Sequence, residues 1–289
     1  MLKTRVITAL VMLAVLYLAT AWLSAFHFAL FMSLVLMVGV VEWTSLMGLV
    51  SLTARILYVS CFALTLVLLG WFVGLQSDAA VLNRDTVLLV CGAGVVFWLY
   101  AMTLLWGYPE NHDRWCNRPQ TALIGLLTLA PAWCALVQLK YLDPRGSLVF
   151  ALIALVSVVD IGAYFTGRAW GRRKLAPALS PGKSWEGFWG GLCACLILTA
   201  LLLIPLHRFV TPLTVPMVIV LLAIVQLVAV FSVVGDLFES MLKRSQGLKD
   251  SGRALPGHGG VLDRIDSLTS AAPVFVFSLM ILMKDVSWQ

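Results

Sequence analysis

The residues best suited to chemistry in this sequence lie between Gly235 and Ser270. The chain has 14 acidic residues, and five of them fall within this short stretch. Two groups of four carry the pattern, namely Asp236, Glu239, Ser240 and Lys243, and then Asp263, Asp266, Ser267 and Ser270. Each group is spaced i, i+3, i+4 and i+7, which places its four side chains on one face of a helix.

The residue types on these two helical faces suit the binding of a metal-bound polyphosphate. Carboxylate oxygens are hard ligands that select Mg²⁺ over zinc or copper, and an ammonium or a hydroxyl can bind phosphate oxygens. Carboxylates are also favoured near a helix N-terminus, so a solvated helix cap with an Asp–Arg pair is the alternative for the second group.

A glycine-rich loop joins the two groups and reads Leu255-Pro-Gly-His-Gly-Gly260. Glycine permits positive φ and lets backbone N–H groups approach a ligand, so this loop can cradle phosphate. A plain tight turn is an equally good interpretation. His258 either donates to phosphate or holds the loop together, and we favour the second role.

The composition places these residues in a membrane protein. Hydrophobic residues make up 61% of the 289 residues and charged residues only 12%, against about 25% charged in soluble domains. The six cysteines contain no C-x-x-C pair, so neither a zinc site nor a disulfide framework is expected. The net charge of +6 requires no nucleic acid, because Lys and Arg beside a membrane attract anionic lipid.

The apolar pattern predicts an all-α, polytopic integral membrane protein with nine transmembrane helices. A bilayer core requires about 20 apolar residues per helix. Nine stretches qualify, at 6–24, 27–47, 56–75, 86–106, 120–139, 147–167, 188–206, 213–235 and 267–283. The first is too long for the 7–15 residues expected of a signal peptide, so we interpret it as a retained helix.

The positive charges predict the orientation of these helices. With the N-terminus in the cytoplasm, 15 of the 20 Lys and Arg residues face that side. We therefore expect one multi-pass domain over 1–289 in a bacterial-type inner membrane, with its site on the cytoplasmic side. Residues 1–145 hold few motifs, whereas 146–289 hold the candidate catalytic residues.

Two acidic residues interrupt apolar helices. Asp160 follows 13 uncharged residues, and a lone carboxylate in hydrocarbon costs roughly 3 kcal/mol, so we expect it to face the bundle interior. Contact with a metal, with cytidine or with an Arg stays open, as does a buried structural pair. Glu42 lies beside Trp43, which favours a position at the membrane interface.

The stretch from Ser240 to Asp266 resembles the signature of phosphatidate cytidylyltransferases, also called CDP-diacylglycerol synthases. It reads S-x-L-K-R, four residues, K-D-x-G, two residues, and L-P-x-H-G-G-V-x-D-R-I-D. Two upstream segments also look like this family, D-x-x-A-Y-F-x-G-R-x-x-G from Asp160 and S-P-G-K-S-W-E-G from Ser180. The second departs from the family at Gly182, where a basic residue is common.

The resemblance implies magnesium-dependent transfer of CMP from CTP to phosphatidic acid for phospholipid biosynthesis, with pyrophosphate released. Asp236, Lys243, Asp263 and Asp266 become the catalytic candidates, with the three Asp residues as metal ligands. The substrate-binding candidates are Ser240, Arg244, Lys249, Asp250, His258, Gly259, Gly260, Arg264, Asp160 and Lys183. A second, monovalent ion and a homodimer stay open.

This reaction needs little acid–base machinery. A phosphomonoester with a second pKa near 6 is largely dianionic at pH 7, so the lipid phosphate is already a nucleophile. The obstacle is repulsion between two anions, which metal ions and cationic side chains must neutralise. The absence of a Ser-His-Asp set is therefore expected.

Other functions fit the sequence less well. A transporter or flippase is expected to show paired interrupted helices and internal symmetry, and no repeat is visible. The D-G-x-x-A-R pattern of CDP-alcohol phosphotransferases and the P-loop of a kinase are both missing. The acidic residues argue against a non-catalytic scaffold.

Overall fold

The computed structural model describes residues 2–112, 115–205, 208 and 213–282. These residues form nine long helices, each long and apolar enough to cross a membrane, as predicted. The helices are α1 Leu2–Trp22, α2 Ala25–Leu46, α3 Leu52–Phe72, α4 Arg84–Trp106, α5 Arg118–Leu142, α6 Ser147–Trp170, α7 Trp185–Pro205, α8 Val215–Ser245 and α9 Leu262–Leu282. A short hairpin of β1 Lys174–Ala176 and β2 Ser180–Ser184 joins α6 to α7.

Local sequence signals explain where several helices begin. Ser24, Ser51, Asn83 and Asn117 each precede a helix, and the side chain of each accepts a hydrogen bond from the backbone N–H three residues later. Such caps satisfy N–H groups that the first turn of a helix leaves free. The cap at Ser24 also starts α2 at Ala25, so only two residues connect it to the end of α1 at Trp22.

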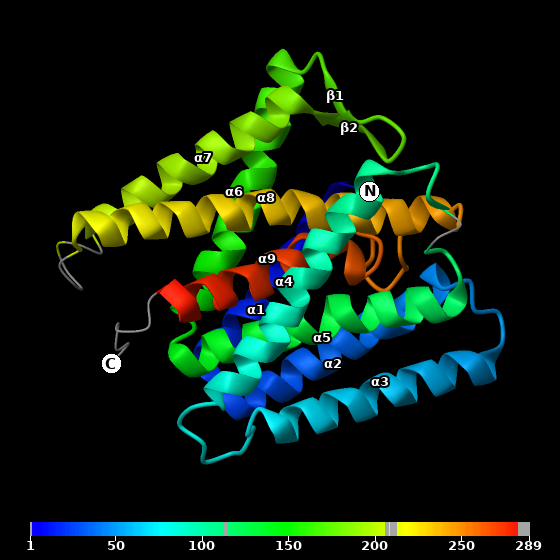
Figure 1. Cartoon of the computed structure of the whole chain (residues 1–289), viewed down its shortest axis with the longest axis horizontal. Coiled ribbons are helices and arrows are strands. Elements are labelled where there is room, and N and C mark those ends of the chain that lie inside the picture. Colours follow the sequence, from blue (N-terminus) through cyan, green and yellow to red (C-terminus); the bar gives the residue numbers. More distant parts are fainter. Residues whose placement is uncertain (1, 113–114, 206–207, 209–212, 283–289) are drawn as a thin grey trace.

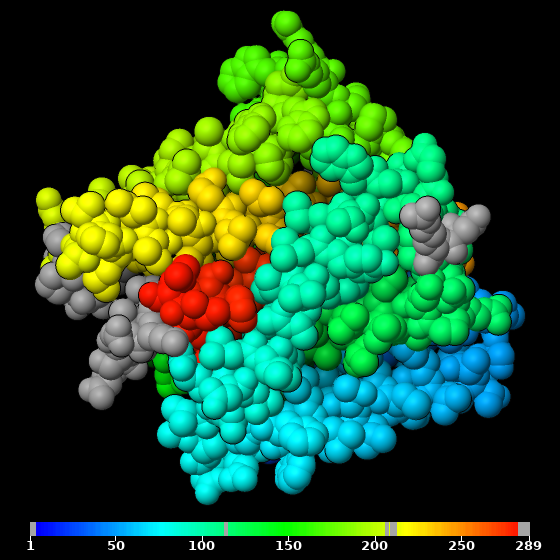
Figure 2. Space-filling model, in the orientation of Figure 1, coloured from blue at the N-terminus to red at the C-terminus, as the bar shows by residue number. Residues whose placement is uncertain are grey.

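The helices form a bundle around α5 and α9, and α7 packs against α6 and α8 at one edge of it (Figure 1). The span of α5 is the most buried, whereas α1 and α3 expose most of their residues. Figure 2 shows α3 along one edge of the molecule and α7 with the β1–β2 hairpin at the opposite edge. The centre of the bundle is thus built from α5, α9 and the helices that cross them.

Small residues let α6 and α7 lie against each other. A Cβ at Gly162 would come within 2.6 Å of Ala194 Cβ and 3.1 Å of Gly190 O. The hairpin beyond them is held by Glu186, whose carboxylate accepts from the backbone N–H of Arg172 at 3.0 Å and of Arg173 at 3.2 Å. Close helix contact through small residues is typical of membrane helices.

Two helix boundaries matter for the site. The eighth apolar stretch was predicted to end at residue 235, but α8 continues to Ser245 and carries Asp236, Glu239 and Lys243 within one helix. The last helix begins at Leu262, before its apolar stretch, so Asp263 and Asp266 lie in its first turns. The residues of the two acidic groups therefore lie within α8 and α9, and not in the loop that joins these helices.

Gly235 sets the distance between α8 and α9. A Cβ at this position would come within 2.4 Å of Ser270 Oγ and 2.5 Å of Asp266 O. Ser270 Oγ also donates to Phe231 O at 2.6 Å, which joins the two helices one turn earlier. Only glycine permits this approach, and the approach brings the acidic residues of the two helices together.

We predict that Gly235→Ala lowers stability by about 1–3 kcal/mol, because the added methyl group must separate α8 from α9. Gly182→Ala is the matched control, since a Cβ there meets nothing within 4 Å. Thermal unfolding of the detergent-solubilised protein measures both variants. Equal midpoints for the two variants would contradict the close approach.

Candidate active site

The acidic residues of the two predicted groups meet where α8 and α9 lie side by side. Lys243 Nζ lies 2.7 Å from Asp263 Oδ1 and 3.1 Å from Glu239 Oε2. The side chains of Asp263 and Glu239 are each 6% exposed, and that of Lys243 is 12% exposed. One ammonium group thus pairs with carboxylates from both helices in a region with little exposure to water.

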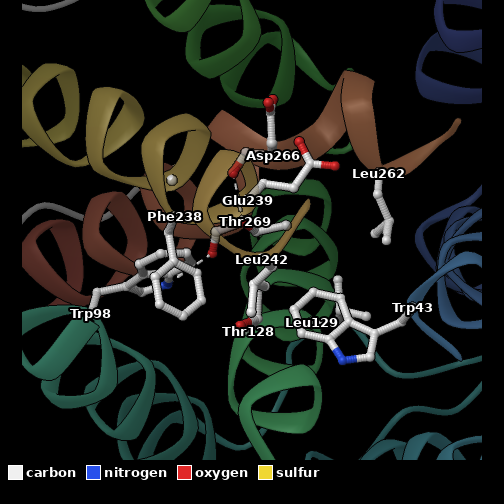
Figure 3. A pocket seen from close by; sticks show the side chains of 11 residues that line it. Trp43, Trp98, Thr128, Leu129, Phe238, Glu239, Leu242, Leu262, Asp266 and Thr269 are labelled. Carbon is white, nitrogen blue, oxygen red and sulfur yellow. Dashed lines mark hydrogen bonds between the residues drawn. The ribbon is translucent and has the colours of Figure 1, made fainter. Parts of the chain in front are cut away.

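Glu239 and Asp266 lie together at the centre of this cluster, where their carboxyl groups interact electrostatically (Figure 3). Asp266 Oδ1 also accepts from the backbone N–H of Ser267 at 2.7 Å. Glu239 Oε1 is buried and has no hydrogen-bond partner among the described residues. Two adjacent carboxyl groups must share a proton or bind a cation, because two bare negative charges repel.

An aromatic floor lies beneath this carboxyl pair (Figure 3). Trp98 and Phe238 pack edge to face at 5.5 Å between ring centroids, and Trp98 Nε1 donates to Thr269 O at 3.2 Å. Trp43 lines the other side and donates to Thr121 O at 3.0 Å. These rings close the cluster on the side of the apolar core, so polar ligands must approach from the opposite side.

A second ion pair extends the cluster toward α6 and the hairpin. Lys183 Nζ, on β2, lies 2.5 Å from Asp236 Oδ2. Asp160 on α6 interacts electrostatically with both Asp236 and Lys183. Asp160 therefore faces the cluster from α6, on the interior side that was expected, and its side chain is accessible at the edge of the cluster. Its contact with a metal, with cytidine or with an Arg stays a prediction.

Asp263 also organises the loop that precedes α9. Its Oδ2 accepts from the backbone N–H of Gly260 at 2.7 Å and of Ser251 at 2.9 Å, and from Ser251 Oγ at 3.0 Å. Leu255 and His258 then close the loop, since Leu255 N–H donates to Gly259 O and His258 N–H donates to Leu255 O. One carboxylate thus joins α8, α9 and the glycine-rich loop.

Glu42 has a structural role that the sequence did not reveal. The position expected for it at the membrane interface stays a prediction, but the residue is 7% exposed and its carboxylate accepts from the backbone N–H of Val261 and of Leu262, each at 2.9 Å. It therefore caps α9 from α2. A carboxylate within an apolar helix indicates a buried polar contact. The sequence could not identify the partners, because these N–H groups lie about 220 residues away along the chain.

Two glycines leave room for the Glu42 carboxylate. A Cβ at Gly252 or at Gly260 would come within 2.4 Å of one of its oxygens. The same carboxylate lies 3.3 Å from Ser251 Oγ. The loop therefore wraps around two buried acids, Glu42 on one side and Asp263 on the other, and glycine is needed where the backbone passes closest.

The remaining predicted residues separate into two places. Ser240 is half-buried on α8, and Arg244 donates to Leu179 O at 3.5 Å and Leu248 O at 3.3 Å, which connects α8 to the hairpin and to the loop. The others line a polar cavity of about 680 Å³ that lies outside the acidic cluster. These residues are Lys249, Asp250, His258, Gly259 and Arg264.

The acidic cluster has the donor chemistry of a site for a hard divalent cation. Carboxylate oxygens from Asp236, Glu239 and Asp266 are the ligands that Mg²⁺ prefers, and the unpartnered Glu239 oxygen is available to such an ion. Within the described residues, no three acidic, His or Cys groups converge as a preformed metal site. The residues fit the ion by the chemistry of their carboxylate donors, and Asp236 is held in an ion pair with Lys183.

Comparison with known proteins places these features in a family. The sequence profile of the Cytidylyltransferase family matches residues 3–282. A phosphatidate cytidylyltransferase of Pseudomonas aeruginosa is 44% identical over 277 residues, which cover 95% of this chain and 96% of the relative. Proteins with the same name from Haemophilus influenzae and Brucella suis are 38% and 34% identical and cover 96% and 99% of the chain.

We predict that Glu42→Gln loosens the loop before α9, because the amide presents a donor where two backbone N–H groups need acceptors. The expected loss of stability is about 1–3 kcal/mol. Hydrogen–deuterium exchange should become faster in residues 249–262. Glu110→Gln is the matched control, since Glu110 is exposed. Unchanged exchange in the Glu42 variant would show that the cap is unimportant.

Proposed function

This chain belongs to the cytidylyltransferase family, and we propose that it transfers CMP from CTP to phosphatidic acid, giving CDP-diacylglycerol and pyrophosphate. The main support is that the family match spans residues 3–282, while carboxylates and ammonium groups gather at one end of two adjacent membrane helices. Such a position lets a water-soluble nucleotide and a bilayer lipid reach one place. Transport and scaffolding are thereby disfavoured.

The side chains of the cluster can neutralise the charge that opposes the reaction. The lipid phosphate attacks the α-phosphorus of CTP, and the bond to the departing pyrophosphate breaks. Lys183 and Lys243 are held among carboxylates, where each can bind phosphate oxygens without leaving its position. Ser240, one turn after Asp236 on α8, adds a hydroxyl on the same helical face.

The charge balance of the cluster supports a divalent ion. Four carboxylates, Asp236, Glu239, Asp263 and Asp266, surround two ammonium groups, so the fully ionised cluster has two unbalanced negative charges. We propose that Asp236, Asp263 and Asp266 hold Mg²⁺, with Glu239 as a further donor. The ion would polarise the phosphates and offset the charge of the leaving group. Asp160 adds one more negative charge, which would suit a monovalent ion.

Asp263 contributes in a second way. One of its oxygens faces Lys243, and the other holds the N–H groups of Ser251 and Gly260. It therefore keeps the glycine-rich loop beside the cluster and orients the Lys243 ammonium. A substitution at Asp263 changes both the charge of the site and the shape of the loop.

The position in the cell is part of the proposal. The named bacterial relatives and the concentration of Lys and Arg in the loops between helices support a multi-pass inner-membrane location with the site on the cytoplasmic side. CTP then arrives from the cytoplasm, and phosphatidic acid arrives laterally from the inner leaflet. No nucleic acid is needed, and a homodimer remains a proposal.

We predict that purified protein with phosphatidic acid releases pyrophosphate from CTP far faster than from ATP, GTP or UTP. EDTA should abolish this release, and excess Mg²⁺ should restore it, because the cluster requires a cation to balance its charge. A pyrophosphate-coupled assay with each nucleotide measures both effects. Release that is independent of lipid, or that is unaffected by EDTA, contradicts the proposed reaction.

We predict that Asp236→Asn lowers kcat roughly a hundredfold or more, because it removes a ligand and the partner of Lys183. Asp85→Asn is the matched control, since Asp85 is exposed in the first turn of α4 and lies outside the cluster. Thermal unfolding of both variants checks their folding. Wild-type turnover by the Asp236 variant would remove this residue from the mechanism.

A further inference from the structure

A second charged region lies against the glycine-rich loop, outside the acidic cluster. It is a polar cavity of about 680 Å³, and four cationic side chains line it. These are Arg5, Lys249, Arg253 and Arg264. Asp250 is the one acidic residue in the lining, so the cavity carries an excess of three positive charges when His258 is neutral.

The cations of this cavity have no protein partner that balances them. In the part of the chain that the structure describes, none of the four takes part in a salt bridge. His258 also lines the cavity, and its buried Nδ1 atom has no hydrogen-bond partner among the described residues. Like charges that converge on one cavity repel one another, and a bound anion relieves that repulsion.

The first helix is fastened to this cavity. Thr8 Oγ1 donates to Pro256 O at 3.0 Å, although the two residues are 248 positions apart in sequence. Gly257 has φ of 77°, and a Cβ there would lie 3.1 Å from Arg5 Cγ. These contacts hold the N-terminal end of α1, and with it Arg5, against the loop.

The cavity also adjoins the acidic cluster. Gly259 lines the cavity, and the next residue, Gly260, donates its N–H to Asp263 at 2.7 Å. The cavity and the cluster therefore adjoin along this loop. A polyanionic chain could contact the cations of the cavity at one end and the cluster at the other.

The geometry points to this cavity as the site that holds the terminal phosphates of CTP, with Arg5 and Arg253 as additional ligands. The inference rests on the proposed function and names the part of the site that binds the leaving group. Guanidinium groups bind phosphate oxygens in a bidentate manner. When the lipid oxygen bonds to the α-phosphorus, the bridging oxygen keeps the electron pair, and pyrophosphate is left in the cavity.

A polyphosphate fits the cavity better than a lipid headgroup, although both present phosphate oxygens. A lipid phosphomonoester carries a charge of about −1.5 to −2 at pH 7, which is less than the cavity's excess of three positive charges. The charged and glycine residues of the lining also offer little apolar wall for a glycerol backbone or acyl chain. The cavity therefore favours the nucleotide.

We predict that Arg5→Gln and Arg253→Gln each raise the KM for CTP roughly tenfold and weaken inhibition by pyrophosphate to a similar degree. The KM for phosphatidic acid should not change. Lys174→Gln is the matched control, because it removes an exposed cation of the hairpin outside the cavity. Steady-state kinetics of the full-length protein in mixed micelles measures all three, and thermal unfolding checks that each variant is folded.

Direct binding separates the two phosphate sources and separates this inference from the proposed function. Equilibrium binding of inorganic pyrophosphate should weaken in both Arg variants, while binding to vesicles that contain phosphatidic acid should not. An unchanged KM for CTP with normal pyrophosphate binding overturns the inference, as does a defect confined to the vesicles. If the wild type makes no CDP-diacylglycerol but binds pyrophosphate through these Arg residues, the proposed reaction fails and the anion site stands.

Discussion

The structure of this site depends on satisfying buried carboxylates and backbone N–H groups with each other. Asp263 and Glu42 together accept hydrogen bonds from the N–H groups of Ser251, Gly260, Val261 and Leu262. Burying an unpaired N–H group or an unpaired carboxylate away from water raises the free energy of the folded protein. A hydrogen bond between the two groups offsets this penalty for both of them. The loop before α9 is therefore shaped by two acids from different helices.

This arrangement divides the polar residues by charge. Acidic side chains and two lysines gather where α8 meets α9, and four further cationic side chains line the cavity on the loop. In the proposed reaction, a cation belongs to the first region and a polyphosphate to the second. A metal–nucleotide complex carries both charges, so it can match both regions at once.

The apolar helices contribute by bringing distant segments to one place. Gly235 allows α8 and α9 to approach, the aromatic rings of Trp98 and Phe238 close the cluster from below, and α1 carries Arg5 to the loop. A bilayer requires helices to satisfy their own backbone groups, so the chemistry is placed at helix ends and in the connecting loop. These features explain why the site is composed mainly of helix-terminal residues.

The sequence by itself determined the nine helices, because about 20 consecutive apolar residues can be satisfied in a bilayer only as a helix. It also determined the acidic faces of α8 and α9, because the spacing of residues along a helix is a local property. Its motifs indicated a resemblance to a known family, which the family match confirms. Only the tertiary structure decided that Glu42 caps α9, that Lys183 reaches Asp236 and that Arg5 joins the basic cavity. Those contacts join residues far apart in the chain, and no local spacing rule encodes which helices become neighbours.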